Sequence, residues 1–169
     1  MDTFVAIDFE TANTEAHSAC ALAMILVEGG QIARREVHLI QPPSPVFTFT
    51  GIHGITWEDV RGERSFGEVW VGVRDILDRA SYLVAHNAGF DRRVLAACCQ
   101  RAQLPMPPLP FVCTVQVARA VWNIRPTKLP NVCASLGIGL KHHDAASDAE
   151  ACAHILVAAL KAGWRHQAR

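Results

Sequence analysis

The sequence has no excess of either charge and no long hydrophobic run. Its 169 residues include 16 lysines and arginines and 16 aspartates and glutamates, so the formal net charge is zero. Overall charge therefore neither supports nor excludes a nucleic-acid partner, and any phosphate binding must come from a local patch or a bound metal. No apolar stretch approaches the roughly 18 residues that a membrane span needs, so we expect no membrane partner.

Zinc-type cysteine spacing and a targeting segment are also missing. The six cysteines include no C-x-x-C pair and no Cys/His cluster with zinc spacing. Most of them lie in apolar surroundings, which favours buried free thiols. The N-terminus begins Met1-Asp2-Thr3 and leads directly into an apolar run, without a signal peptide. These features favour a reducing, cytoplasmic location.

No internal repeat and no linker divides the chain. Half of the residues are hydrophobic, which is enough to build an ordinary core. We therefore expect a single domain over residues 1–169, with a core of about residues 3–160 and a short basic C-terminal tail.

The apolar run at residues 4–11 ends in two carboxylates. Val, Ile and Phe favour extended backbone, so this short run predicts a buried strand. Residues i and i+2 of a strand point to the same side, so Asp8 and Glu10 project together. Such a pair repels itself and costs desolvation energy unless a positive charge lies between the two groups. The usual candidate is a divalent cation with hard oxygen ligands, Mg²⁺ or Mn²⁺.

The rest of the pattern predicts an α/β fold. Residues 19–27 and 32–40 indicate two further strands around a turn, so the first three strands form an antiparallel meander. After an irregular segment at 46–62, helices alternate with short strands. The expected strands are 81–85 and 111–113. The expected helices are about 65–80, 90–103, 115–122, 129–136 and 145–160.

Two of these helices have clear start signals. Ser65 is a candidate N-cap with Glu68 three residues later, the pattern of a capping box. Asp144 is interpreted as the N-cap of the last helix.

Three more residues could complete a site with the strand-end pair. Asp91 follows a predicted strand at the start of a helix, Asp148 lies in the first turns of the last helix, and His143 precedes Asp148 by five residues. Singly, each has an ordinary interpretation, because acids favour helix N-termini and loop histidines are usually solvated. Together they fall at strand ends and helix starts, where α/β folds place active sites. Four carboxylates also match the charge of two divalent ions.

Three segments of this sequence resemble the exonuclease motifs of the DEDD superfamily, in the same order. They are Asp8-Phe9-Glu10-Thr11, His86-Asn87-Ala88-Gly89-Phe90-Asp91 and His143-Asp144-Ala145-Ala146-Ser147-Asp148. The resemblance is to the DnaQ-like group, which includes the proofreading epsilon subunit of bacterial DNA polymerase III. The joint occurrence of the three motifs is highly specific, although each alone would be weak.

The spacing H-x-x-x-x-D matches the DEDDh branch of that group. The other branch has a tyrosine four residues before the last acid, but here that position is Asp144, and the only tyrosine is Tyr82. Two further segments are also similar to the family, residues 51–56 and 128–138. The resemblance covers about residues 4–160.

The resemblance implies an RNase H-like fold with a five-stranded mixed sheet, order 3-2-1-4-5, flanked by helices. It implies a metal-dependent 3′–5′ exonuclease that releases nucleoside 5′-monophosphates from single-stranded DNA by a two-metal-ion mechanism. Asp8, Glu10, Asp91 and Asp148 would hold two Mg²⁺ or Mn²⁺ ions. His143 would act as the general base, with His142 as its rival.

The resemblance also implies substrate contacts, and it leaves several alternatives open. The contacts are expected at Thr11, Ala12, His53, Asn87 and Phe90, whereas Phe9 points away from the acids and is expected to pack in the core. The chain ends soon after the last helix, without the extension by which an epsilon subunit holds its polymerase. This favours a stand-alone exonuclease, or one used by a loosely associated DNA polymerase.

Three further alternatives concern substrate, activity and assembly. An exoribonuclease that trims RNA 3′ ends is the alternative enzyme. A non-catalytic nucleic-acid-binding module on the same fold ranks lower, because all five catalytic-type residues are present. Homologues of this fold are often dimers, so both monomer and homodimer stay open.

Overall fold

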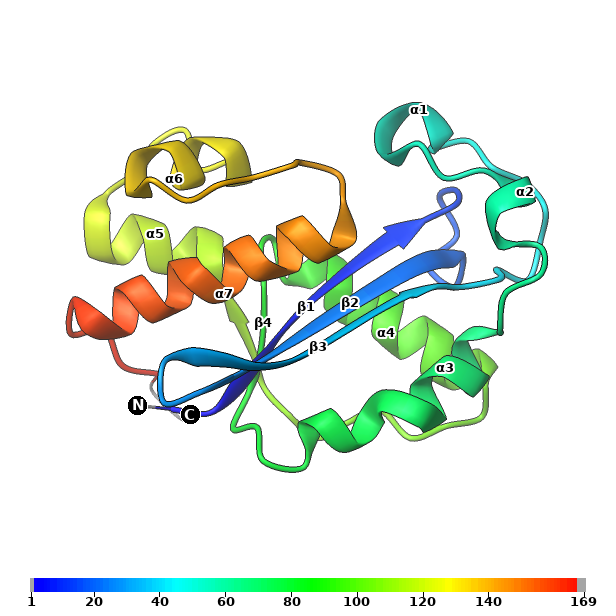
Figure 1. The fold of residues 1–169 in the computed structure, drawn as a ribbon, viewed down its shortest axis with the longest axis horizontal. Coiled ribbons are helices and arrows are strands. Elements are labelled where there is room, and N and C mark those ends of the chain that lie inside the picture. Colours follow the sequence, from blue (N-terminus) through cyan, green and yellow to red (C-terminus); the bar gives the residue numbers. More distant parts are fainter. Residues whose placement is uncertain (1, 167–169) are drawn as a thin grey trace.

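The computed structural model describes residues 2–166, so residues 167–169 of the expected basic tail lie outside the described residues. Five strands form one mixed sheet in the order β3-β2-β1-β4-β5 (Figure 1). The strands are β1 Phe4–Thr11, β2 Ala19–Glu28, β3 Gln31–Leu39, β4 Leu83–Ala85 and β5 Phe111–Cys113. The first three strands pair antiparallel, and β4 pairs parallel to both β1 and β5. The predicted fold class and strand order are confirmed.

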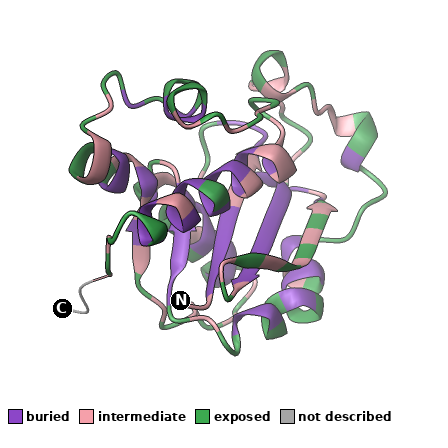
Figure 2. Ribbon diagram, turned by 60° about the vertical axis from the view of Figure 1, so that its left-hand side comes forward, coloured by how far each residue is buried: buried purple, intermediate pink, exposed green. Residues whose placement is uncertain are grey.

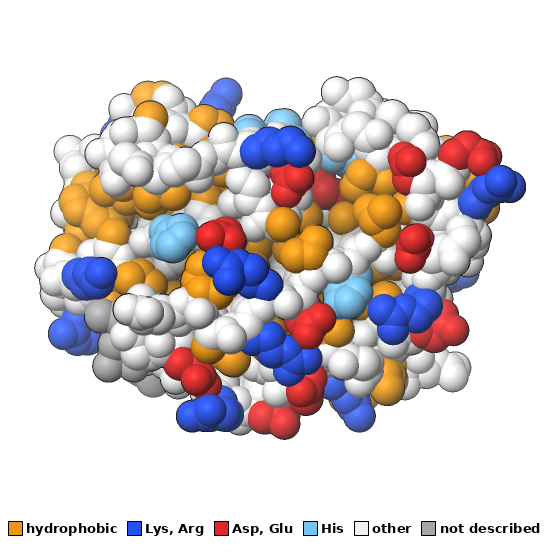
Figure 3. Space-filling model, viewed as in Figure 1, with side chains coloured by type: hydrophobic (Ala, Val, Ile, Leu, Met, Phe, Trp, Pro, Cys, Tyr) orange, Lys and Arg blue, Asp and Glu red, His pale blue; other side chains and the backbone are white. Residues whose placement is uncertain are grey.

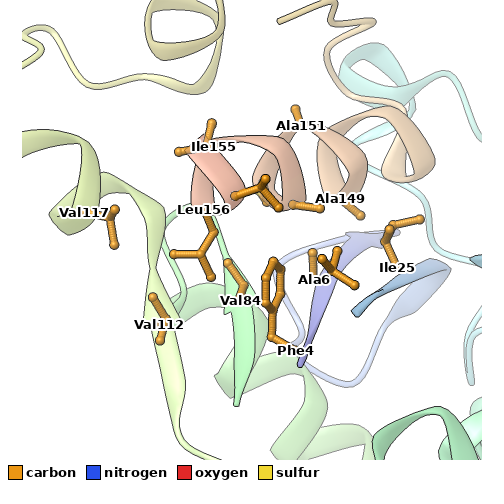
Figure 4. Packing of buried hydrophobic residues seen from close by; sticks show 14 of the residues in the cluster. Phe4, Ala6, Ile25, Val84, Val112, Val117, Ala149, Ala151, Ile155 and Leu156 are labelled. Atoms are coloured by element: carbon orange, nitrogen blue, oxygen red, sulfur yellow. The ribbon is translucent and has the colours of Figure 1, made fainter. Parts of the chain in front are cut away.

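Helices cover both faces of the sheet. They are α1 Thr50–His53, α2 Trp57–Val60, α3 Phe66–Val73, α4 Gly89–Arg101, α5 Thr114–Trp122, α6 Leu129–Leu136 and α7 Ala145–Lys161, with a 3₁₀ turn at Arg74–Leu77. Phe4 and Ala6 of β1 pack on one face against α7, where Ile155 and Leu156 are fully buried (Figure 4). Val5 and Ile7 pack on the other face, against α3 and α4.

The central strands are therefore buried on both sides, as Figure 2 shows by the purple strands between helices with exposed outer faces. Alternate side chains of β1 enter the two hydrophobic clusters, which fixes the register of the strand. Five of the six cysteines are buried free thiols, and Cys113 is half-buried. No helix within residues 2–166 is long and apolar enough to cross a membrane.

The predicted helix starts are confirmed at both caps. The Ser65 backbone N–H donates to Glu68 Oε2 at 2.8 Å, and Ser65 Oγ accepts from the Glu68 N–H at 3.4 Å. Asp144 Oδ1 accepts from the Ser147 N–H at 3.1 Å at the start of α7. The bounds expected for β5 and α6 are also confirmed.

Other predicted bounds were wrong. The strand expected at 81–85 is only Leu83–Ala85, and the helix expected to reach residue 80 ends at Val73 and continues as a 3₁₀ turn. The helix expected to begin near residue 115 begins at Thr114. The segment 46–62, predicted to be irregular, contains α1 and α2, which are single turns too short to show hydrophobic periodicity.

Candidate active site

A pocket of about 500 Å³ lies at the carboxyl ends of β1 and β4. These two strands are parallel, so the segments that follow them meet at one edge of the sheet. Figure 1 shows the end of β1 close to α1 and to the start of α7. The pocket is lined from β1, α1, the β4–α4 turn, α5, the α5–α6 loop and the loop before α7.

The two carboxylates of β1 face this pocket. Asp8 and Glu10 both line it, and their carboxylate oxygens lie within 4.8 Å of each other and of an Asp148 oxygen. Phe9, between them, is 2% exposed and packs its ring 6.3 Å from the ring of Phe66. Strand alternation thus directs the acids to the pocket and Phe9 to the core, as predicted.

Asp91 lies in the first turn of α4, where it is 1% exposed. Its Oδ1 accepts a hydrogen bond from the Phe9 N–H at 3.0 Å. This bond ties the start of α4 to β1 between the two β1 acids. The third predicted acid is therefore adjacent to the pair and more deeply buried than either.

Burial and mutual repulsion disfavour the ionised forms of the clustered carboxylates. Burial raises the pKa of Asp8 well above its usual value, and the charges of Asp91 and Asp148 raise it further. Burial, with the Asp148 charge, raises the pKa of Glu10 to about 7, and burial raises the pKa of Asp91 to about 8. Lys128 is the only Lys or Arg among the described residues that line the pocket. The protein itself therefore leaves the carboxylates largely unneutralised.

The donor set fits a divalent cation. Carboxylate oxygens are the ligands that Mg²⁺ and Mn²⁺ prefer, and three of them already lie within 4.8 Å of one another. Bringing negative charges together in this way costs free energy that a bound cation recovers.

Two adjacent histidines hold Asp148 in place. His142 Nδ1 lies 3.0 Å from Asp148 Oδ2, and the His143 backbone N–H donates to the same oxygen at 3.2 Å. Burial raises the pKa of Asp148, while the neighbouring His142 opposes that rise. The two imidazole rings stack with centroids 3.8 Å apart, and both line the pocket.

His53 of α1 is fixed with both ring nitrogens occupied. Its Nδ1 accepts from the Ile55 N–H at 3.1 Å, so Nε2 carries the proton and donates to the Thr11 carbonyl at 3.0 Å. Burial lowers the pKa of His53, which keeps the ring neutral. Four predicted substrate contacts line the pocket, namely Thr11, His53, Asn87 and Phe90.

Ala12 is the predicted contact that the structure does not bring to the pocket. Its side chain is fully buried against Cys20 and Val60. Its N–H donates to the Ser18 carbonyl at 2.8 Å, and its carbonyl accepts from the Thr48 N–H at 2.8 Å. With its backbone groups engaged, Ala12 offers no group to a ligand here.

Several lining residues were not predicted. The apolar ones are Phe49, Ile52, Val115 and Leu129, and Ile52 is 53% exposed. His86 Nδ1 lies 2.8 Å from Thr114 Oγ1, and its Nε2 lies 3.0 Å from the Thr127 carbonyl, so it joins β4 to α5 and the α5–α6 loop. Ile52, Lys128 and Leu129 fall within the family-like segments 51–56 and 128–138, so the resemblance of these segments could have indicated them.

Comparison with known proteins decides the class of this site. The family model RNase T, described as an exonuclease, matches residues 5–156. The chain belongs to the RNase T exonuclease family. The resemblance to the DnaQ-like exonucleases that the three motifs indicated is thereby confirmed.

Curated relatives of the exonuclease domain are DNA polymerases III of the PolC type. The protein from Thermotoga maritima is 31% identical over 92% of this chain, and that from Streptococcus suis is 32% identical over 94%. The chain spans only 12% and 11% of the length of these relatives.

Solved structures share the fold. Exonuclease X in complex with 5′ overhanging duplex DNA is 25% identical, with a TM-score of 0.74 over 96% of this chain and 94% of that one. The nuclease domain of 3′hExo, a DEDDh family member bound to rAMP, is 20% identical, with a TM-score of 0.82 over 96% of this chain and 93% of that one.

Proposed function

We propose that the protein removes nucleotides from the 3′ end of single-stranded DNA, in proofreading or repair, and releases nucleoside 5′-monophosphates. The observation that carries this proposal is the gathering of acids from β1, α4 and α7 at one pocket. Asp8, Glu10 and Asp148 share that pocket, Asp91 is bonded to the β1 backbone between them, and His143 lies at its edge.

We assign the metal-binding role to Asp8, Glu10, Asp91 and Asp148. Four carboxylates balance the charge of two divalent ions, Mg²⁺ or Mn²⁺. Such ions, when bound, supply Lewis-acid polarisation of the scissile phosphate and stabilise charge on the leaving oxygen.

His143 takes the proton of the attacking water in this proposal. Imidazole is the side chain most often used as a general base. Within residues 2–166 no hydrogen bond engages the ring nitrogens of His143, whereas Nδ1 of His142 is already 3.0 Å from Asp148. This difference favours His143 as the base and gives His142 the task of orienting Asp148.

The other residues that line the pocket hold the terminal nucleotide. Single strands are bound by stacking on aromatic or apolar faces and by polar contacts to the backbone. Phe90 and His53 offer ring faces, and Thr11 and Asn87 offer polar groups at the same pocket. The hydrogen bonds of His53 fix its ring before substrate arrives, which lowers the entropic cost of binding.

DNA is preferred to RNA as the substrate because the PolC-type relatives are DNA polymerases. The same likeness supports association with a DNA polymerase and, with it, the expected cytoplasmic location.

The direct test uses 5′-labelled 20-mers of single-stranded DNA and RNA, with free or blocked 3′ ends. We expect a ladder that shortens from the free 3′ end of DNA with Mg²⁺ or Mn²⁺, and none with EDTA, with a blocked end or in Asp8→Ala. Internal cleavage, or activity that survives EDTA, would overturn the proposal. A higher kcat/KM on RNA would replace DNA by RNA as the substrate.

A further inference from the structure

The net charge of zero conceals a strong segregation of charge along the chain. Residues 1–91 contain six lysines and arginines and thirteen acids, whereas residues 92–143 contain seven lysines and arginines and no acid. The remaining residues, 144–169, contain three of each. The helices α4, α5 and α6 and the loops between them are therefore purely basic after Asp91.

Four cations of this segment belong to α4, α5 and the α5–α6 loop, which all contribute residues to the pocket lining. Lys128 lines it directly, and the Arg93 guanidinium lies 6.0 Å from the ring of Phe90, which also lines it. Arg119 Nε donates to Thr127 Oγ1 at 2.9 Å, and Arg125 belongs to the same loop, two residues before Thr127. We call Arg93, Arg119, Arg125 and Lys128 the basic rim.

The basic rim has no counter-charge of its own. All four side chains belong to exposed residues, and none is in an ion pair with another residue between 2 and 166. Elsewhere cations pair with acids, as Arg34 does with Asp75 and Arg35 with Glu150. Figure 3 shows one such face, where Lys and Arg side chains are interspersed with Asp and Glu.

The other side of the pocket has the opposite character. It is formed by α1, which contains no Lys, Arg, Asp or Glu and whose His53 is neutral. Beyond α1, the exposed acids Glu58, Asp59 and Glu63 alternate with Arg61 and Arg64, and Glu58 pairs with Arg61. This side therefore has no excess of positive charge, and a polyanion leaving the pocket is attracted toward α4 and the α5–α6 loop.

We propose that the basic rim binds the phosphates of the strand upstream of the nucleotide being removed. This inference rests on the proposed function, because it takes the 3′ end to lie at the acidic pocket. The rim directs the upstream strand over α4 and the α5–α6 loop. It also offsets the repulsion between the acidic pocket and the substrate backbone, and it gives binding that depends on strand length and on salt.

The test measures binding without cleavage. Fluorescence anisotropy in EDTA gives the Kd of labelled dT oligomers of 2, 6, 12 and 20 nucleotides over a range of salt concentrations. The test variant is Arg93→Gln/Arg125→Gln. The control is Arg74→Gln/Arg79→Gln, which removes the same charge before the N-terminal end of β4, at the opposite edge of the sheet from the pocket. Circular dichroism and thermal unfolding verify that both variants are folded.

The rim variant should weaken binding of the 12-mer and 20-mer and leave the 2-mer unaffected. For the 20-mer, the slope of log K against log salt should fall by about 0.7 for each lost phosphate contact, roughly 1.4 in all, and the control should keep the wild-type slope. An unchanged slope in the rim variant, or an equal loss on the 2-mer, would overturn the proposal. Polyglutamate serves as a second anionic probe. If the rim variant bound the dT oligomers as wild type does but lost binding to polyglutamate, the rim would be assigned to an acidic protein partner and the proposal would be overturned.

Failure of the proposed function gives a different result. If wild-type protein degrades no 3′ end but the rim variant loses salt-dependent binding, the role of the rim in phosphate binding is supported and the exonuclease proposal is rejected. If wild-type protein degrades 3′ ends and the slope of log K against log salt is unchanged in the rim variant, only the proposal about the rim is rejected.

Discussion

Asp148 is the residue at which the contacts of the site converge. It is 5% exposed and lies beside both β1 acids. Its Oδ2 contacts the ring of His142 and accepts a hydrogen bond from the backbone N–H of His143. One oxygen therefore orients the loop that carries the two histidines. The geometry separates their roles, because His142 is bound through its ring and His143 through its backbone.

Replacement of each histidine tests that separation. We expect His143→Ala to lower kcat by about 100-fold or more, since a general base contributes that much, and His142→Ala to have a clearly smaller effect. Steady-state kinetics on a labelled DNA oligomer give both values. His154→Ala, an exposed histidine paired with Glu150, is the control. A larger loss of kcat in His142→Ala than in His143→Ala would show that His142 is the base.

The buried acids make a second prediction at this scale. Their pKa values are raised on folding, so their contribution to stability is fully present below the unfolded pKa, near 4, and is lost as pH rises through the folded pKa. For Glu10 and Asp91 that loss accumulates from about pH 4 upward and is complete near pH 7 and pH 8, respectively. In EDTA, the melting temperature of Asp8→Asn should exceed that of wild type at pH 8.5, because one repelling charge is gone.

At pH 4 the advantage of Asp8→Asn should disappear, since the wild-type acids are then protonated. Asp78→Asn, an exposed acid after the 3₁₀ turn, is the control and should follow wild type at both values. Scanning calorimetry measures the two differences. A lower melting temperature for Asp8→Asn at pH 8.5 in EDTA would contradict the repulsion described here.

The sequence could predict the placement of some site residues and not of others. The direction of Asp8 and Glu10 follows from strand alternation, which depends only on local backbone geometry. Ala12 could not be placed, because a register shift at Glu10–Thr11 and the folding of residues 48–49 over it decide its surroundings. The contact of His142 with Asp148 depends on the loop at His143, whose φ of 65° is unusual for a non-glycine residue.

The elements that carry these residues differ in how strongly the local sequence specifies them. α3, α6 and α7 begin or end at clear signals: the Ser65–Glu68 box, Gly137 with φ of 68°, and the Asp144 cap. α1 and α2 are single turns, too short to show hydrophobic periodicity, although Thr56 and Asp59 form a capping box at the start of α2. This is why hydrophobic periodicity predicted the long helices and missed the short ones.

The capping box of α3 offers a test at the scale of elements. Ser65→Ala removes the oxygen that accepts from the Glu68 N–H, so the free energy of unfolding should fall by about 1 kcal/mol. Urea unfolding measures the change. Ser135→Ala is a suitable control, because its hydroxyl donates to the Asn131 carbonyl within α6 and caps no helix start. Equal losses in the two variants would argue that the box does not stabilise α3.

At the scale of the whole molecule, the fold brings one acidic centre and one basic surface to the same edge of the sheet. The acids come from β1, α4 and α7, and the cations come from the acid-free segment 92–143. This arrangement suits a ligand that is itself a polyanion with a reactive end. It also explains why overall composition gave no indication of a nucleic-acid partner.

Calorimetric titration of chelator-stripped protein with Mn²⁺ tests whether the four carboxylates form a divalent-metal centre. We expect two ions bound per chain in wild type and in Asp78→Asn, and at most one in Asp8→Asn. Absence of Mn²⁺ binding in wild type, or an unchanged count in Asp8→Asn, would contradict it.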